Sequence, residues 1–152
     1  MAISTAAARA QILDDLAEAI DQIGIAVACL GEAFEMVSVQ AGDRLEAELF
    51  RPGQKAYAGS RQTYARFAER HGVPKREFEL PAPGRPSQGA KSFIERAVVA
   101  TGNAGQKISE LQDSGLALEF GDPDLRSGLI EVRELLGVVP GNARTFLRTL
   151  GR

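Results

Sequence analysis

Residues 13–37 read LDDLAEAIDQIGIAVACLGEAFEMV and carry the strongest periodic pattern in the chain. The large apolar side chains that recur every three or four residues are Leu13, Leu16, Ile20, Ile23, Val27, Leu30, Phe34 and Val37. This spacing keeps one apolar seam on one side of a helix over more than three heptads. The pattern predicts one long helix from about Ser4 to about Val39, with the seam turned toward other helices.

The residues around the middle of this seam are also small or apolar. A two-stranded coiled coil usually places Glu or Lys beside its seam, whereas this helix has residues such as Ala17, Gly24, Ala26, Gly31 and Ala33 there. Even the outward positions Ile25, Ala28 and Cys29 are apolar. A helix that is apolar on every side is covered on every side. We therefore expect Ile25, Ala28 and Cys29 to take part in self-association with a second copy of the chain.

A second helix is expected to follow, running to about His71. Gly42 followed by Asp43 and Glu46 is typical of a stop and a new capping box, so this helix would begin near Asp43. Proline disrupts helices, which predicts a kink or break near Pro52-Gly53. The alternative is one helix that continues to Phe50, with residues 51–53 as a turn.

Residues 72–86 are rich in proline and glycine and form a predicted linker between an N-terminal helical hairpin and the C-terminal helices. Ser87 is the expected cap of a third long helix. Its seam is predicted to consist of Ile94, Ala97, Thr101, Ala104, Ile108, Leu111 and Leu118. The glycines of this region, Gly102, Gly105 and Gly115, are interpreted as positions of close helix approach.

Two short helices are predicted to complete the chain. Asp122-Pro123 is a typical helix start, with aspartate as the cap and proline in the first turn. The helix after it should run to about Leu136. Its buried side chains should be Leu125, Leu129, Val132 and Leu136. Asn142, after Pro140-Gly141, is the expected cap of a last helix that ends near Leu150.

The fold class that follows is all-α, with residues 1–152 as a single domain. The expected architecture is an antiparallel helical bundle of three long helices plus two short C-terminal helices. The chain has 152 residues, 44% of them hydrophobic and 25% charged, which is typical of a globular protein. No secretory segment is recognised, and the longest uncharged apolar run, residues 23–31, is too short to span a membrane. We expect a cytoplasmic protein that does not bind membranes.

Charge is distributed unevenly along the chain. Residues 1–50 hold 2 basic and 9 acidic side chains, whereas residues 51–76 hold 7 basic and 1 acidic. Neutralisation between neighbouring helices explains this pattern without any ligand. The competing interpretation is that the basic segment meets an external anion. Nucleic acid is not favoured, because the basic residues are spread around the helix and the net charge of the chain is −2.

One polar face in the second helix is a candidate ligand-binding site. Tyr57, Ser60, Tyr64 and His71 recur at helical spacing on the expected inner side, where packing alone favours leucine. The predicted ligand-binding residues are Tyr57, Tyr64 and His71 of this face together with Arg66 and Arg70, in a pocket facing Thr101 of the third helix. The alternative is structural, with the phenol groups at the rim of the bundle and His71 at a helix end.

The sequence offers little support for catalysis. A single cysteine and a single histidine exclude an intramolecular disulfide, a cysteine-based zinc site and a site with several histidines. Glu32-x-x-Glu35 and Glu110-x-x-Asp113 resemble the Mg²⁺-binding motifs of all-α nucleotide pyrophosphatases. However, Glu32 and Glu35 point away from the seam, and the two motifs are too far apart for that family's hairpin.

The expected function is therefore non-enzymatic, with no cofactor and no metal. We expect a helical-bundle module for protein–protein interaction or self-association, whose partner is a second copy or another protein. The alternative is a small-molecule or anion-binding sensor that uses the Tyr/His/Arg face. A Mg²⁺-dependent phosphohydrolase is a distant third.

Overall fold

The computed structural model describes residues 3–85 and 89–150, and over these residues the chain is all-helical with no strand. The predicted all-α class is confirmed. The elements are α1 (Thr5–Met36), α2 (Val39–Leu45), the π-helix η1 (Glu46–Phe50), α3 (Arg51–His71), α4 (Gly89–Asp113), α5 (Gly115–Phe120), α6 (Pro123–Gly137) and α7 (Val139–Leu150).

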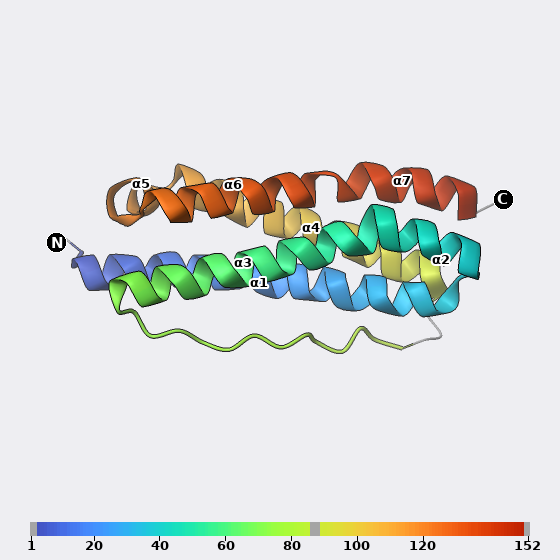
Figure 1. The fold of residues 1–152 in the computed structure, drawn as a ribbon, viewed down its shortest axis with the longest axis horizontal. Helices are drawn as coiled ribbons and strands as arrows, with labels where there is room; N and C mark the ends of the chain where they lie inside the picture. The colour runs from blue at the N-terminus through green and yellow to red at the C-terminus, as the bar shows by residue number, and fades with distance from the viewer. Residues whose placement is uncertain (1–2, 86–88, 151–152) are drawn as a thin grey trace.

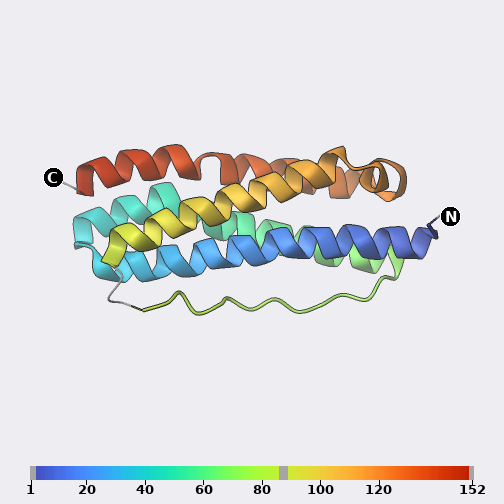
Figure 2. The same cartoon turned by 180° about the vertical axis from the view of Figure 1, so that it is seen from behind.

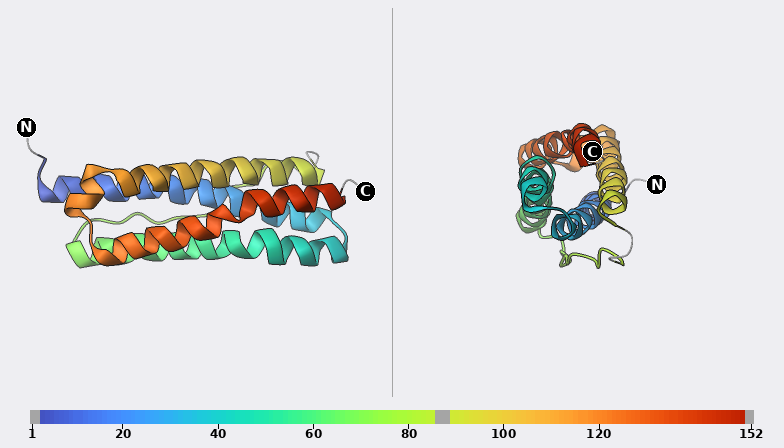
Figure 3. Two further views of the ribbon diagram at one scale, coloured as in Figure 1. Left: turned by 90° about the horizontal axis from the view of Figure 1, so that it is seen from above. Right: turned by 90° about the vertical axis from the view of Figure 1, so that its right-hand side faces the viewer.

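The long helical segments lie side by side around a shared core (Figures 1 and 2). In Figure 1 the chain runs from left to right along α1, returns through α2, η1 and α3, and crosses back along an extended segment. It then returns along α4 and finishes along α6 and α7. α1 packs against α3 and α4, and α6 packs against the same two helices, so the end view in Figure 3 shows a closed ring.

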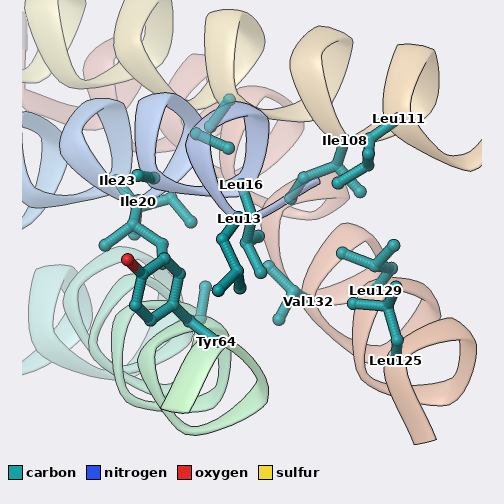
Figure 4. Packing of buried hydrophobic residues seen from close by; sticks show 14 of the residues in the cluster. Leu13, Leu16, Ile20, Ile23, Tyr64, Ile108, Leu111, Leu125, Leu129 and Val132 are labelled. Carbon is teal, nitrogen blue, oxygen red and sulfur yellow. The ribbon is translucent and has the colours of Figure 1, made fainter. Parts of the chain in front are cut away.

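α1 closely matches its predicted extent. Ser4 caps it, because its hydroxyl oxygen accepts the Ala7 N–H at 3.1 Å. The seam is buried from Leu13 to Leu30. The last two residues of the seam, Phe34 and Val37, are half-buried. This helix supplies the apolar side chains that meet those of α3, α4 and α6 in the centre of Figure 4.

The predicted boundary at Gly42-Asp43 is wrong. Ser38 caps α2 by accepting the Ala41 N–H at 3.2 Å, and Gly42 lies within the helix. A Cβ on Gly42 would lie 3.3 Å from the Phe34 ring. Glycine at this position therefore lets α2 fold back closely onto the end of α1, rather than ending a helix.

Pro52 neither breaks the helix nor forms a turn. The chain stays helical from Val39 to His71, and the disturbance takes the form of η1, in which the Arg51 N–H bonds to the Glu46 carbonyl five residues earlier. The alternative with a turn at residues 51–53 is wrong as well. A π-turn widens the helix just before the proline, where the ring would otherwise collide with the preceding turn.

α4 buries most of its predicted seam, from Ile94 to Leu111. The predicted cap, Ser87, lies outside the described residues. Leu118 is not part of the seam and is 67% exposed, because Ser114 ends the periodicity and caps the separate helix α5. Within the chain, Gly102, Gly105 and Gly115 are not positions of close helix approach, since a Cβ on any of them would meet nothing within 4 Å.

The C-terminal helices are partly as predicted. Asp122 caps α6 by accepting the Leu125 N–H at 2.8 Å, and the predicted apolar face is buried: Leu125, Leu129, Val132 and Leu136. Asn142 does not cap the last helix, because α7 begins at Val139 and already includes Pro140. The two C-terminal helices are separate elements, as predicted, and they lie end to end along the bundle (Figure 1).

Residues 73–85 carry no helix and are referred to below as the strap. The strap follows the outside of α1 and α3 for much of their length (Figure 1). Arg76 anchors the strap to α1 through a bidentate ion pair with Asp21. At its other end, Arg96 of α4 donates to the Pro83 carbonyl at 2.6 Å. None of the helices in residues 3–85 and 89–150 combines the length and the apolarity that a membrane span requires.

Candidate functional site: a polar groove between α3 and α6

The chain's basic helix α3 and the C-terminal helix α6 border a groove of about 300 Å³. The α3 wall consists of Lys55, Gly59, Gln62, Thr63, Arg66 and Arg70. The α6 wall consists of Asp124, Ser127, Gly128, Glu131, Val132 and Leu135. On both helices these residues recur every three or four positions, so each wall is one continuous helix face.

Gly128 of α6 and Thr63 of α3 face each other across the groove. A Cβ on Gly128 would collide with the Thr63 hydroxyl and lie 2.8 Å from the Thr63 methyl carbon. The Thr63 hydroxyl is itself held, donating to the Gly59 carbonyl at 2.9 Å. Glycine at position 128 therefore sets the distance between the walls.

The walls differ in charge, since α3 contributes Lys55, Arg66 and Arg70 and α6 contributes Asp124 and Glu131. Arg70 is already neutralised, because it donates two hydrogen bonds of 2.8 Å to the Asp122 carboxylate and lies 3.6 Å from Asp124. Within the described part of the chain, no hydrogen bond or ion pair involves the side chain of Lys55, Arg66 or Glu131.

Asp122 does not line the groove itself, but it binds the groove residue Arg70 and accepts hydrogen bonds from three groups. Arg70, the Leu125 N–H and His71 all bind its carboxylate, and the distance from His71 Nε2 to Asp122 Oδ2 is 2.8 Å. Burial alone would raise the pKa of Asp122, but these hydrogen bonds lower it to about 2. The carboxylate thus joins the end of α3 to the start of α6.

The two tyrosines of the predicted ligand face lie elsewhere, beneath the strap. Tyr64 is 5% exposed, its hydroxyl oxygen accepts the Arg76 N–H at 3.1 Å, and its ring meets Phe78 edge-on at 5.0 Å. Tyr57 is 7% exposed, and the Arg61 guanidinium lies 4.3 Å from its ring centre.

The predicted pocket between Tyr57 and Thr101 does not form. The Tyr57 ring lies against Gly24 of α1, where Pro81 of the strap also packs. The Thr101 hydroxyl is buried and donates to the Val98 carbonyl. Ser60 is buried too, and its hydroxyl donates to the Tyr57 carbonyl.

The structure therefore divides the predicted face of five residues into three places. Tyr57 and Tyr64 support the strap, His71 holds Asp122, and only Arg66 and Arg70 line the same groove. Sequence reasoning missed Lys55, Gln62 and Ser127. The spacing of Lys55 and Gln62 relative to Arg66 on α3 could be read from the sequence, but the position of Ser127 on the opposite wall, α6, could not.

The predicted self-association residues also lie in different surroundings. Cys29 is completely buried inside its own chain, so it offers no surface to a second copy. Burial raises the pKa of its thiol, and the nearby Arg96 charge lowers it to a lesser degree. Ile25 and Ala28 are half-buried. Ile25 lines a shallow groove with Val99 of α4, which is 63% exposed.

The two acidic motifs considered for Mg²⁺ lie far from each other. Lys107 binds Glu18 at 2.8 Å, which places that part of α4, including Glu110, beside the first half of α1. Glu32 lies fourteen residues beyond Glu18, or about 21 Å along the helix at 1.5 Å per residue. Glu32 and Glu110 therefore cannot share one ion, which removes the geometric basis of the phosphohydrolase hypothesis. Over the described residues, no three metal-ligating side chains come together.

Comparisons with known proteins add no relative. No family model matches this chain, and no curated protein or solved structure matches it either. Its function has to be inferred from the surfaces that its own residues form.

Proposed function

We propose that this chain is a non-enzymatic, cytoplasmic, antiparallel helical-bundle module that self-associates through the face shared by α1 and α4. The supporting observation is the pair formed by Val99 and Ile25 along a shallow groove of about 340 Å³. Val99 is 63% exposed, although it lies in the middle of a long helix. The exposed surface of this groove is mostly apolar, and contiguous exposed apolar patches mark interaction sites.

The outer face of α4 suits close packing against another helix. Gly102 lies one turn beyond Val99 on this face, and a side chain at Gly102 or Gly105 would meet nothing in the chain. Glycine inside a helix costs about 1 kcal/mol relative to alanine, and here no intramolecular contact explains it. Small residues permit close approach of a partner helix.

The same face is complementary to itself. In a two-fold pairing of α4 with a second α4 running in the opposite direction, residues equally distant from Gly102 face each other. Lys91 then meets Asp113. This match of charge favours a second copy as the partner over an unrelated protein.

The test is the mass of the native protein in solution at tens of micromolar. We expect a clean multiple of 16.2 kDa for the wild type. The double variant Ile25→Glu/Val99→Glu should have the mass of one chain, because charge in the interface opposes association. The matched control is Ile130→Glu, which alters a 51% exposed apolar residue on α6 and should leave the mass unchanged. A monomeric wild type, or an unchanged mass of the double variant, would refute the proposal.

A further inference from the structure

We infer that the groove between α3 and α6 binds a small organic phosphate monoester, with its phosphate group at Arg66. This site is separate from the self-association face. α3 and α4 occupy opposite corners of the ring of helices in the end view (Figure 3). Ligand binding in the groove between α3 and α6 therefore does not depend on the oligomeric state.

Arg66 is the available cation at the polar end of the groove. Its neighbour Arg70, one turn further along α3, already binds Asp122 and Asp124. Within the described ranges, the side chain of Arg66 takes part in no ion pair and no hydrogen bond. The planar guanidinium can donate two parallel hydrogen bonds to a phosphate or carboxylate, which makes arginine the preferred residue for such groups.

Two further donors near Arg66 favour a tetrahedral anion. Gln62 lies one turn before Arg66 on α3, and Ser127 lies on the opposite wall. Among the residues that the structure describes, neither side chain has a hydrogen-bond partner. Donors on both walls can bind three oxygens that point in different directions. A phosphate monoester has three such oxygens, whereas a carboxylate has two.

The rest of the groove limits the organic part of the ligand. Away from Arg66 the α6 wall becomes apolar at Val132 and Leu135, which suits a short hydrocarbon or aromatic group. Lys55 lies eleven residues from Arg66, or about 16 Å along the helix, so one phosphate cannot reach both cations. Glu131 lines the space between them and disfavours a second anionic group there. A compact monoester therefore fits better than a polyphosphate.

The experiment is a titration of the ¹⁵N-labelled protein with phenyl phosphate, followed by the backbone amide signals. We expect saturable shifts concentrated at residues 62–66 and 127–128. Arg66→Gln should raise the Kd for phenyl phosphate roughly tenfold, the effect of losing one strong charge-assisted contact. Arg66 is exposed and has no described partner, so this variant should keep the melting temperature of the wild type.

The matched control is Arg126→Gln, which removes an exposed arginine from the other side of α6. It should leave the Kd unchanged, as should Val99→Glu on the self-association face. Benzoate, which carries a carboxylate in place of the phosphate, should bind more weakly than phenyl phosphate. Equal binding of benzoate, equal losses in both arginine variants, or shifts spread over all basic residues would overturn the inference.

Discussion

At the scale of single residues, Pro52 explains a contact between distant parts of the chain. Proline has no backbone N–H, so the Glu48 carbonyl four residues earlier loses its usual helical partner. The Asn142 side-chain amide of α7 donates to that carbonyl at 2.8 Å, across 94 positions of sequence. The defect in one helix is therefore satisfied by another helix.

This arrangement predicts that Asn142→Ala will lower the free energy of unfolding by about 1–2 kcal/mol, because it leaves a part-buried carbonyl without a donor. Urea denaturation measures the change. Pro52→Ala is the informative second substitution, since it restores an N–H at position 52. In the Pro52→Ala background the cost of Asn142→Ala should become smaller. An equal cost in both backgrounds would show that the Glu48 carbonyl is not the cause.

At the scale of helices, two glycines that both lie inside a helix have opposite surroundings. Gly128 of α6 lies against Thr63, which leaves no room for a methyl group. Gly102 of α4 faces open space. The spacing of α3 and α6 therefore depends on a missing side chain, whereas the packing of α4 within the chain does not.

We expect Gly128→Ala to destabilise the protein by about 1–3 kcal/mol, because the new methyl group must push α3 and α6 apart. Gly102→Ala should instead stabilise it by up to about 1 kcal/mol, the difference in helix propensity. Urea denaturation in the Val99→Glu background measures both changes in the free energy of unfolding. This background separates helix stability from self-association. Thr63→Ala removes the atoms in collision and should reduce the cost of Gly128→Ala. A destabilising Gly102→Ala would contradict this account of α4.

At the scale of the whole molecule, buried apolar clusters and a few polar contacts join the N-terminal helices to the C-terminal ones. Among these contacts, Lys107 binds Glu18 and Arg70 binds Asp122. The Asp122 carboxylate is only 17% exposed and has three donors. Because its pKa falls from the ordinary 3.8 to about 2 on folding, the stability of the molecule depends on acid pH.

The lowered pKa of Asp122 sets the direction in which stability changes with pH. Asp122 contributes its full stabilisation above about pH 4, and this contribution disappears as the pH falls through about 2. Near pH 6 the free energy of unfolding of the wild type should exceed that of Asp122→Asn by about 2 kcal/mol. Near pH 2 the two values should converge. Asparagine still caps α6, so the comparison isolates the charge. Asp124→Asn, at a 78% exposed position, should show no such pH-dependent difference. Parallel pH curves for wild type and Asp122→Asn would refute the assignment.

The features that the sequence determined by itself are those decided within about four residues. The seam of α1 and the Asp122 cap of α6 are examples, because periodicity and capping depend on neighbours within one turn. The all-α class follows from the same local patterns. Local patterns also misled where a residue had two possible uses: Gly42 reads as a stop and Asn142 as a cap.

Only the tertiary structure decided which surfaces meet. The predicted tyrosine, histidine and arginine face was consistent with the periodicity of α3, but the strap covers Tyr64 while Arg66 is left facing α6. Whether a glycine is crowded, as at Gly128, or open, as at Gly102, depends on a helix distant in sequence. The physical reason is that helix periodicity sets the relative directions of side chains around one axis. Which other helix each of these side chains contacts is decided by the packing of the whole chain.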